Sequence, residues 1–223
     1  AAQQTSAMEP ASAVATRAPP DDRPAIWYLG APPTQLSRAA LTSRAAAVAA
    51  WLRAHTPSAG HVALLVDEGA WLPAAILGVL AAARVVVPLD PRHPPARLRA
   101  LAAAASVCAV LAAPKDAASV SALAAEGDAL PVLQLPDGLP PGAIADAEWR
   151  PDAVDADTPS HVYFTSGTTG TPKGVLGHHG GLRAFALAQA ERYGLTSASR
   201  MFLASSLTFD PCLGDIVTAF LSR

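Results

Sequence analysis

The chain has 223 residues, enough for one large domain or two small ones. Hydrophobic residues make up 51% of it and charged residues only 15%, so the composition allows a large buried core. The formal net charge of −2 gives no reason to expect binding to nucleic acid or to an anionic membrane surface. Two cysteines, Cys108 and Cys212, are too few for a disulfide framework and lack metal-ligand spacing.

The chain shows no convincing membrane span or secretion signal. Its longest apolar tracts, residues 70–83 and 100–113, fall short of the ~20 residues that a bilayer requires. The first residues lack a charged stretch followed by an apolar one, so no signal peptide is predicted. A reducing, cytoplasmic location is therefore the default expectation. The chain has no initiator Met and ends within an apolar run, so we expect it to be part of something longer.

Residues 1–24 are rich in Ala, Ser, Pro and Gln, a composition typical of a flexible lead-in or linker. Residues 26–29 could form a short strand. A helix is predicted over residues 36–53, because its apolar residues follow the spacing of a helix face that packs on a core. These residues are Leu41, Ala45, Val48 and Leu52.

Strands and helices then alternate along the chain. Continuous apolar runs predict strands, and Ala-rich stretches between them predict helices. The expected strands are residues 62–66, 85–89, 107–111 and 132–135, and the expected helices are residues 70–83, 96–105 and 117–125. This alternation predicts an α/β fold with a largely parallel sheet covered by helices on both faces.

The last third of the chain begins with residues 136–159, whose Pro, Asp and Gly predict a surface connection. A strand is expected at residues 161–164, then a glycine-rich loop, a helix over residues 181–192, and a strand at residues 201–204.

The loop from Thr165 to Gly174 is the most informative stretch of the chain. It reads Thr-Ser-Gly-Thr-Thr-Gly-Thr-Pro-Lys-Gly and follows the expected strand at residues 161–164 directly. Glycines let backbone N–H groups approach a ligand, while hydroxyls and an ammonium group add donors. The loop therefore has the composition of a polyphosphate site.

The spacing of its glycines and lysine distinguishes this loop from two other phosphate-binding motifs. A Walker A loop needs Gly, four residues and then Gly-Lys-Ser/Thr, whereas Lys173 is preceded by Pro172 and followed by Gly174. The G-x-G-x-x-G turn of dinucleotide-binding folds does not occur in the chain either. The alternative that the loop is only a polar turn stays open, since Gly, Ser, Thr and Pro are ordinary turn residues.

The loop resembles the signature loop of the adenylate-forming enzyme superfamily. That superfamily includes the amino-acid adenylation domains of nonribosomal peptide synthetases, acyl- and aryl-CoA ligases, and luciferases. The resemblance implies that the loop holds the β- and γ-phosphates of ATP while a substrate carboxylate attacks the α-phosphorus. It implies phosphate-binding roles for Thr165, Ser166, Gly167, Thr168, Thr169, Gly170 and Lys173, with Lys173 and Thr165 also serving catalysis.

A second resemblance covers residues 85–91, which read Val-Val-Val-Pro-Leu-Asp-Pro and are similar to a segment that ends a strand in this superfamily. Its role looks architectural, because Pro88 and Pro91 fix the backbone and Asp90 suits a turn or a cap. The residues just before this strand, Ala81-Ala82-Ala83, depart from the usual Lys-Ala-Gly.

A third resemblance bears on the substrate. Phe209-Asp210 is similar to the Phe-Asp pair of amino-acid adenylation domains, in which the aspartate pairs with the substrate α-ammonium. Alternatively, Asp210 only opens a turn before Pro211. Cys212 is expected to be a small buried residue rather than a nucleophile. For His179 we expect capping or packing, and no metal site is expected with His178.

The resemblance as a whole implies that residues 25–223 are the N-terminal portion of an AMP-binding (adenylation) domain. Such a domain activates an amino acid with ATP and Mg²⁺, with most Mg²⁺ ligands expected beyond Arg223. A downstream carrier domain with phosphopantetheine is expected if the protein is a synthetase. An acyl- or aryl-CoA ligase and a non-catalytic nucleotide-binding remnant remain alternatives.

Overall fold

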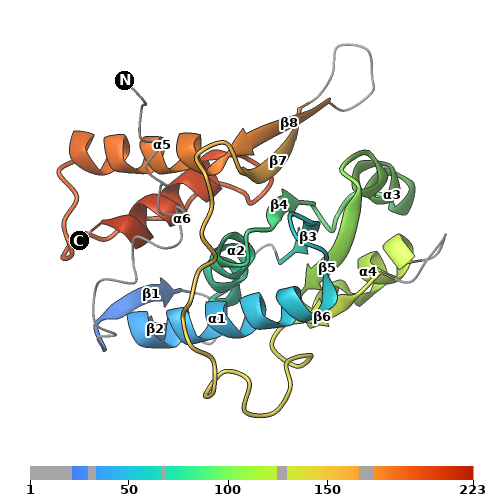
Figure 1. The fold of residues 1–223 in the computed structure, drawn as a ribbon, viewed down its shortest axis with the longest axis horizontal. Coiled ribbons are helices and arrows are strands. Elements are labelled where there is room, and N and C mark those ends of the chain that lie inside the picture. The colour runs from blue at the N-terminus through green and yellow to red at the C-terminus, as the bar shows by residue number, and fades with distance from the viewer. Residues whose placement is uncertain (1–21, 30–33, 67–68, 125–129, 166–172, 223) are drawn as a thin grey trace, which may run out of the picture.

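A computed structural model describes residues 22–29, 34–66, 69–124, 130–165 and 173–222. Its main feature is a six-stranded sheet with helices packed on it (Figure 1). The strands follow the order β6-β5-β3-β4-β7-β8 across the sheet. A separate two-stranded ribbon precedes it in the chain.

The large sheet is parallel except at one edge. Strands β3 to β7 run in the same direction, and β8 pairs with β7 in the opposite direction. The predicted largely parallel α/β fold is thus confirmed. The strands are β1 Pro24–Tyr28, β2 Thr34–Ser37, β3 His61–Leu65, β4 Val85–Pro88, β5 Val107–Ala112, β6 Val132–Gln134, β7 Pro159–Thr165 and β8 Lys173–His178.

Helices connect most of the parallel strands. They are α1 Arg38–His55, α2 Trp71–Ala81, α3 Pro95–Ala104, α4 Ala117–Ala124, α5 His179–Arg192 and α6 Pro211–Leu221, with a short 3-10 turn, η2, at Pro114–Asp116. One apolar cluster joins residues of α1, α2, α5 and α6 to the sheet. A second cluster joins residues of α3 and α4 to it. Both faces of the sheet are therefore covered, as the alternating pattern predicts.

Helix α1 shows how the sequence specifies this packing. Ser37 begins it, because its hydroxyl oxygen accepts a hydrogen bond from the Ala40 amide at 3.1 Å. The four residues of the predicted apolar stripe are all buried. At Gly78 of α2 the two helices approach so closely that a Cβ atom would lie 2.7 Å from the Val48 side chain. A larger residue there would push the helices apart.

The prediction of a strand at residues 201–204 is wrong. These residues form no strand, and the Phe202 side chain is 82% exposed. Apolar residues alone do not make a strand, since a strand also needs a neighbour for its backbone hydrogen bonds. Sequence analysis also missed β2, β8 and α6. In β8, Gly174, Gly177 and exposed side chains replace the continuous apolar run of a buried strand.

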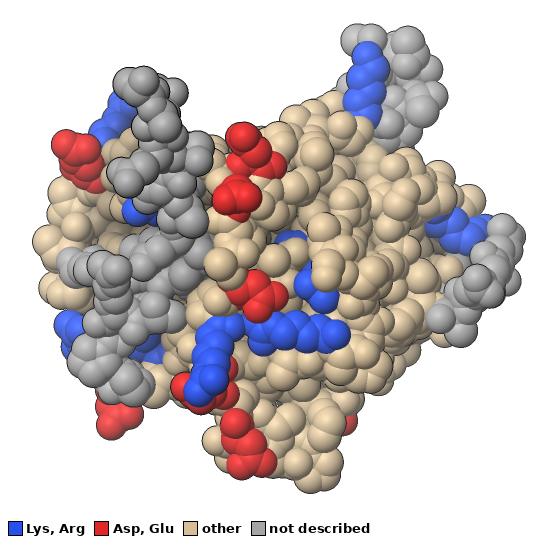
Figure 2. Space-filling model, viewed as in Figure 1, with Lys and Arg blue, Asp and Glu red and all other residues tan. Residues whose placement is uncertain are grey.

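Within the described residues, no helix is both long enough and apolar enough to cross a bilayer. Basic and acidic side chains are mixed on the face shown in Figure 2 and form no large area of a single sign there.

Candidate active site

Of the predicted phosphate-binding residues, the structure describes Thr165, the last residue of β7, and Lys173, the first residue of β8. Strands β4 and β7 are parallel neighbours that pair at Val86 and His161, so their carboxyl ends lie on the same side of the sheet. In open α/β sheets, ligands bind outside the carboxyl ends of the strands. The fold therefore brings Pro88, at the end of β4, and Thr165, at the end of β7, to the carboxyl ends of the strands, where a ligand is expected.

Thr165 and Lys173 lie opposite each other at the end of the β7–β8 hairpin where the chain passes from one strand to the other. The Thr165 hydroxyl donates a long hydrogen bond of 3.5 Å to the Lys173 carbonyl oxygen. Both residues are exposed, so their side chains are accessible to a ligand. The connecting residues, which include the predicted site residues Ser166, Gly167, Thr168, Thr169 and Gly170, lie outside the described residues.

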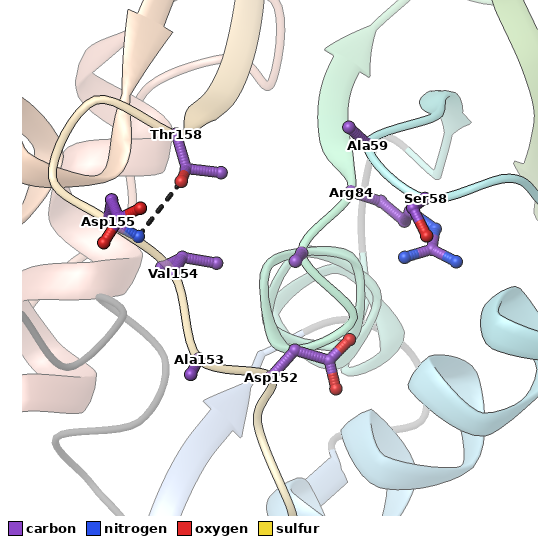
Figure 3. Close-up of a pocket in the computed structure, with 9 residues that line it drawn as sticks. Ser58, Ala59, Arg84, Asp152, Ala153, Val154, Asp155 and Thr158 are labelled. Atoms are coloured by element: carbon purple, nitrogen blue, oxygen red, sulfur yellow. Dashed lines mark hydrogen bonds between the residues drawn. The ribbon is translucent and has the colours of Figure 1, made fainter. Parts of the chain in front are cut away.

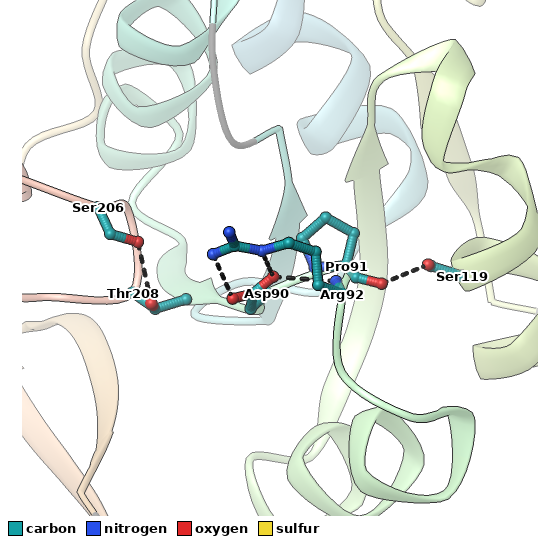
Figure 4. Close-up of polar contacts among 6 residues, drawn as sticks. All are labelled: Asp90, Pro91, Arg92, Ser119, Ser206 and Thr208. Carbon is teal, nitrogen blue, oxygen red and sulfur yellow. Dashed lines mark hydrogen bonds and ion pairs between the residues drawn. The ribbon is translucent and has the colours of Figure 1, made fainter.

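The segment after β4 has the architectural role predicted for it. Asp90 accepts hydrogen bonds from the Arg92 amide (2.9 Å) and from the Arg92 guanidinium (2.9 and 2.8 Å; Figure 4). These bonds hold the pKa of the Asp90 carboxyl below its usual value. Ser119 donates to the Pro91 carbonyl oxygen and ties the turn to α4. Asp90 thus stabilises the turn that leads into α3.

Asp210 occupies the N-cap position of α6, directly before Pro211. Its side chain makes no capping hydrogen bond, and no hydrogen bond or ion pair to its carboxylate is found in the described part of the chain. The residue is exposed, as is Phe209 at 60%. An exposed carboxylate at a helix N-terminus is favoured by the helix dipole and is free to bind a cation. Asp210 also lies in a turn, in which the Cys212 amide donates to the Phe209 carbonyl oxygen at 3.0 Å, so the turn interpretation agrees with the structure as well.

The strand β7 presents two polar side chains on its α6-facing side. Tyr163 belongs to the apolar cluster that includes Cys212, whereas Val162 belongs to the cluster on the opposite face. His161, two residues before Tyr163, shares its face and meets its ring edge-on, with centroids 5.6 Å apart. Burial lowers the pKa of His161 and raises that of Tyr163, and the charge of the Asp210 carboxylate opposes the first of these shifts and adds to the second.

Burial keeps three groups of this region in their neutral forms. It lowers the pKa of His179 to about 4 and raises the pKa of Cys212 to about 11. It also raises the pKa of Tyr163 well above its ordinary value. Cys212 is therefore a buried thiol and a poor nucleophile, as predicted. His179 begins α5 fully buried, which fits the predicted packing role.

A cavity among the described residues lies elsewhere. It has a volume of about 390 Å³ and is lined by Ser58, Ala59, Ala83, Arg84, Asp152, Ala153, Val154, Asp155 and Thr158 (Figure 3). Several of these residues precede β3, β4 and β7, so the cavity lies at the amino ends of the strands. The buried Arg84 guanidinium already donates to Thr56 and to the Ala82 carbonyl oxygen. This cavity is therefore a separate feature from the candidate active site.

Sequence analysis missed His161 and Tyr163. It left His161 without a role and counted Tyr163 only as part of an apolar strand. The alternation of β7 places both on one face with Thr165, and this signal could have been read from the sequence. No group of three potential metal ligands was found among the described residues.

Comparison with known proteins places the chain among nucleotide-dependent enzymes. A family model described as AMP-binding enzyme matches residues 12–223. The nonribosomal peptide synthase roqA of Penicillium rubens is 34% identical over 165 residues, which are 72% of this chain and 6% of that protein. The chain spans less than a tenth of the length of the curated relatives it matches.

Solved structures share the fold. An AMPPNP-bound nonribosomal peptide synthetase, FmoA3, matches with a TM-score of 0.76 at 24% identity, over 90% of this chain and 20% of that one. An ATP-bound RpMatB–BxBclM chimera matches with a TM-score of 0.82 at 24% identity, over 97% and 44% of the two chains. The chain belongs to the AMP-binding enzyme family, and its α/β fold is that of the adenylate-forming enzymes.

Proposed function

We propose that this chain is the N-terminal part of an amino-acid adenylation domain in a longer synthetase. The observation that carries the proposal is the order of residues from Thr165 to Lys173, together with the positions of Thr165 and Lys173. The two described ends of this segment, Thr165 and Lys173, pair at the carboxyl end of β7, the side of an α/β sheet where ligands bind. Family membership and a nonribosomal peptide synthase relative support the same function.

The proposed reaction joins a carboxylate to AMP. A carboxylate oxygen of the amino acid attacks the α-phosphorus of ATP and forms a new P–O bond. The bond between the α-phosphorus and the oxygen bridging to the β-phosphorus breaks, and pyrophosphate leaves with that electron pair. Because both reactants are anionic, the protein must position them and neutralise phosphate charge.

The hairpin end supplies these interactions. Lys173 offers an exposed ammonium group at the start of β8, and Thr165 offers a hydroxyl at the end of β7. Ser166, Gly167, Thr168, Thr169 and Gly170 would add hydroxyl and backbone donors around the β- and γ-phosphates. Mg²⁺ would accompany the ATP, and none of these roles depends on where its ligands lie.

Asp210 is proposed to recognise the amino group of the substrate, with Phe209 beside it. The Asp210 carboxylate is exposed and makes no described hydrogen bond, and Cys212, two residues later, packs in the same apolar cluster as Tyr163 of β7, the strand that ends at Thr165. A charge-assisted contact with an α-ammonium group would fix one end of the substrate. The substrate carboxylate would then point toward the phosphate end of the same strand. A carrier domain with phosphopantetheine is proposed to accept the activated amino acid.

The test is amino-acid-dependent exchange of labelled pyrophosphate into ATP by the complete synthetase. A panel of the common amino acids should contain at least one that supports exchange above the background without amino acid. Exchange with fatty or aryl acids plus coenzyme A, and with no amino acid, would instead show an acid–thiol ligase. Nucleotide binding without turnover of any acid would indicate a non-catalytic protein.

A further inference from the structure

Helices α5 and α6 lie side by side, and the Gln189 side chain of α5 forms hydrogen bonds with two residues of α6 (Figure 1). Its Nε2 atom donates to the Asp215 carboxylate at 3.1 Å, and its Oε1 atom accepts from the Thr218 hydroxyl at 2.9 Å. Because an ionised carboxylate only accepts hydrogen bonds, a single orientation of the Gln189 amide satisfies both partners. The amide therefore fixes how α6 is set against α5.

A close contact one helical turn earlier reinforces this arrangement. Phe185 precedes Gln189 by four residues on the same side of α5, and its ring lies against Gly214 of α6, where an added Cβ atom would be 2.5 Å from it. The fully buried Thr218 also lies 2.7 Å from the Gly214 carbonyl oxygen. Tight packing at a glycine and directional hydrogen bonds both resist rotation or sliding of one helix along the other.

Helix α5 is in turn attached to the sheet that carries the hairpin. It begins at His179, the residue that follows β8 directly. The His179 amide donates to the Thr158 carbonyl oxygen at 2.9 Å. Leu182 and Ala186 of α5 belong to the apolar cluster that includes Tyr163 of β7. The position of α6 relative to the hairpin is thus set through α5.

The direction of the Asp210 side chain depends on α6. The Asp210 backbone is helical, with φ −52° and ψ −31°, and its carbonyl oxygen accepts a hydrogen bond from the Gly214 amide at 3.3 Å. Its carboxylate makes no capping hydrogen bond that would hold it in place. Because a helical backbone sets where each Cα–Cβ bond points, this carboxylate moves with α6.

We propose that Gln189 is a positioning residue for Asp210: its amide fixes α6 on α5 and so holds the Asp210 carboxylate where the ammonium group of the substrate meets it. This inference rests on the proposed role of Asp210. Without the Gln189 hydrogen bonds, α6 shifts on α5 and recognition of the amino acid weakens. Thr165 and Lys173 belong to β7 and β8, so the end of the hairpin that holds ATP keeps its geometry.

The test is pyrophosphate exchange by the complete synthetase, with KM measured separately for the amino acid and for ATP. Gln189→Ala should raise the amino-acid KM about tenfold, because a displaced carboxylate makes a weaker directional contact, while the ATP KM changes by less than about twofold. Glu191→Ala is the matched control, because Glu191 is exposed in the last turn of the same helix. This control should keep both KM values of the wild type.

An exchange of charge separates hydrogen bonding from packing. Gln189→Glu places a second carboxylate beside Asp215 and should raise the amino-acid KM at least as much as Gln189→Ala. Adding Asp215→Asn restores a donor opposite an acceptor, since the Asn amide can donate to the Glu carboxylate, which still accepts from Thr218. The double variant should therefore return the amino-acid KM to near its wild-type value.

Equal increases in both KM values in Gln189→Ala, or an unchanged amino-acid KM, would overturn the proposal. A double variant no better than Gln189→Glu would do the same. If Gln189→Ala does not fold, the comparison of Gln189→Glu with the double variant still decides. Absence of amino-acid-dependent exchange in the wild type would instead refute the proposed function, so the two failures are distinguishable.

Discussion

Helix pairs α1–α2 and α5–α6 contribute to the same apolar cluster but differ in what they bury and expose. The α1–α2 pair buries almost only aliphatic side chains and packs tightly at Gly78. The α5–α6 region buries Ser160, His179 and Thr218. It also holds most of the exposed large apolar residues, from Val175 to Phe209. The α1–α2 pair therefore contributes mainly to the stability of the fold. The α5–α6 region differs from an ordinary core, because it buries polar side chains and exposes apolar ones, and it is the region that contains candidate site residues.

The largest expected effect is a loss of folding stability at low pH, and it tests the burial of a polar side chain in the α5–α6 region. His179 is fully buried, and neither ring nitrogen has a described hydrogen-bond partner, so its pKa falls to about 4. The unfolded chain binds a proton near pH 6.5 and the folded chain does not, so stability is lost as the pH falls from 6.5 toward 4. The loss should reach about 3 kcal/mol.

Urea unfolding at a series of pH values, for the wild type and His179→Leu, measures this loss. The variant cannot take up that proton, so its stability should depend less steeply on pH between 6.5 and 4. Parallel pH curves for the two proteins would show that His179 does not carry a lowered pKa.

The next effect tests the exposed end of the hairpin. Replacing Lys173 with Ala should slow adenylate formation by about 100-fold, because a charge that stabilises the transferring phosphates is lost. The fold should persist, since the side chain is exposed. Lys115→Ala is the matched control, because Lys115 is also exposed and the chain has no third lysine. Equal exchange rates in the two variants would remove Lys173 from the mechanism.

A smaller effect tests the tight packing of the α1–α2 pair. Gly78→Ala adds a methyl group 2.7 Å from Val48, and overpacking of this kind costs about 1–3 kcal/mol. The higher helix propensity of Ala recovers at most about 1 kcal/mol, so the net result should be destabilising. Thermal or urea unfolding reports the difference.

The smallest effect is expected for a substitution in α5, Gly181→Ala, which is the matched control for Gly78→Ala. A Cβ at Gly181 would meet no atom within 4 Å, so Gly181→Ala should stabilise the fold by about 0.5–1 kcal/mol. Opposite signs at Gly78 and Gly181 would confirm that one helix pair is closely packed and that α5 is open at this position. The same sign at both would contradict that contrast.

The sequence predicts the buried part of the fold well for a physical reason. Strands β3, β4 and β5 are continuous apolar runs because they are buried on both faces, and α1 carries a stripe because it is buried on one. Strand β8 gives no such signal, since it lies at the sheet edge with two glycines and exposed side chains. Residues 201–204 gave a false signal, because apolar character does not supply a pairing partner.

The candidate site was predicted from residue types in a particular order rather than from burial. That order identifies Thr165, Lys173 and Asp210 as candidate site residues. The structure places all three at exposed positions. His161 and Tyr163 could not be linked to Asp210 in this way. Their association depends on the pairing of β7 with β8 and on the packing of α6, which bring together residues about 50 positions apart.

The central claim is that Asp210 recognises the amino group of an acid that the hairpin activates. Pyrophosphate exchange with the active amino acid and with its analogue lacking the amino group tests it directly, in the wild type and in Asp210→Asn. The wild type should prefer the amino acid by 100-fold or more in kcat/KM, and the variant should lose most of that preference, as expected for a lost charge-assisted contact. The KM for ATP should change little. An undiminished preference in Asp210→Asn would contradict the account.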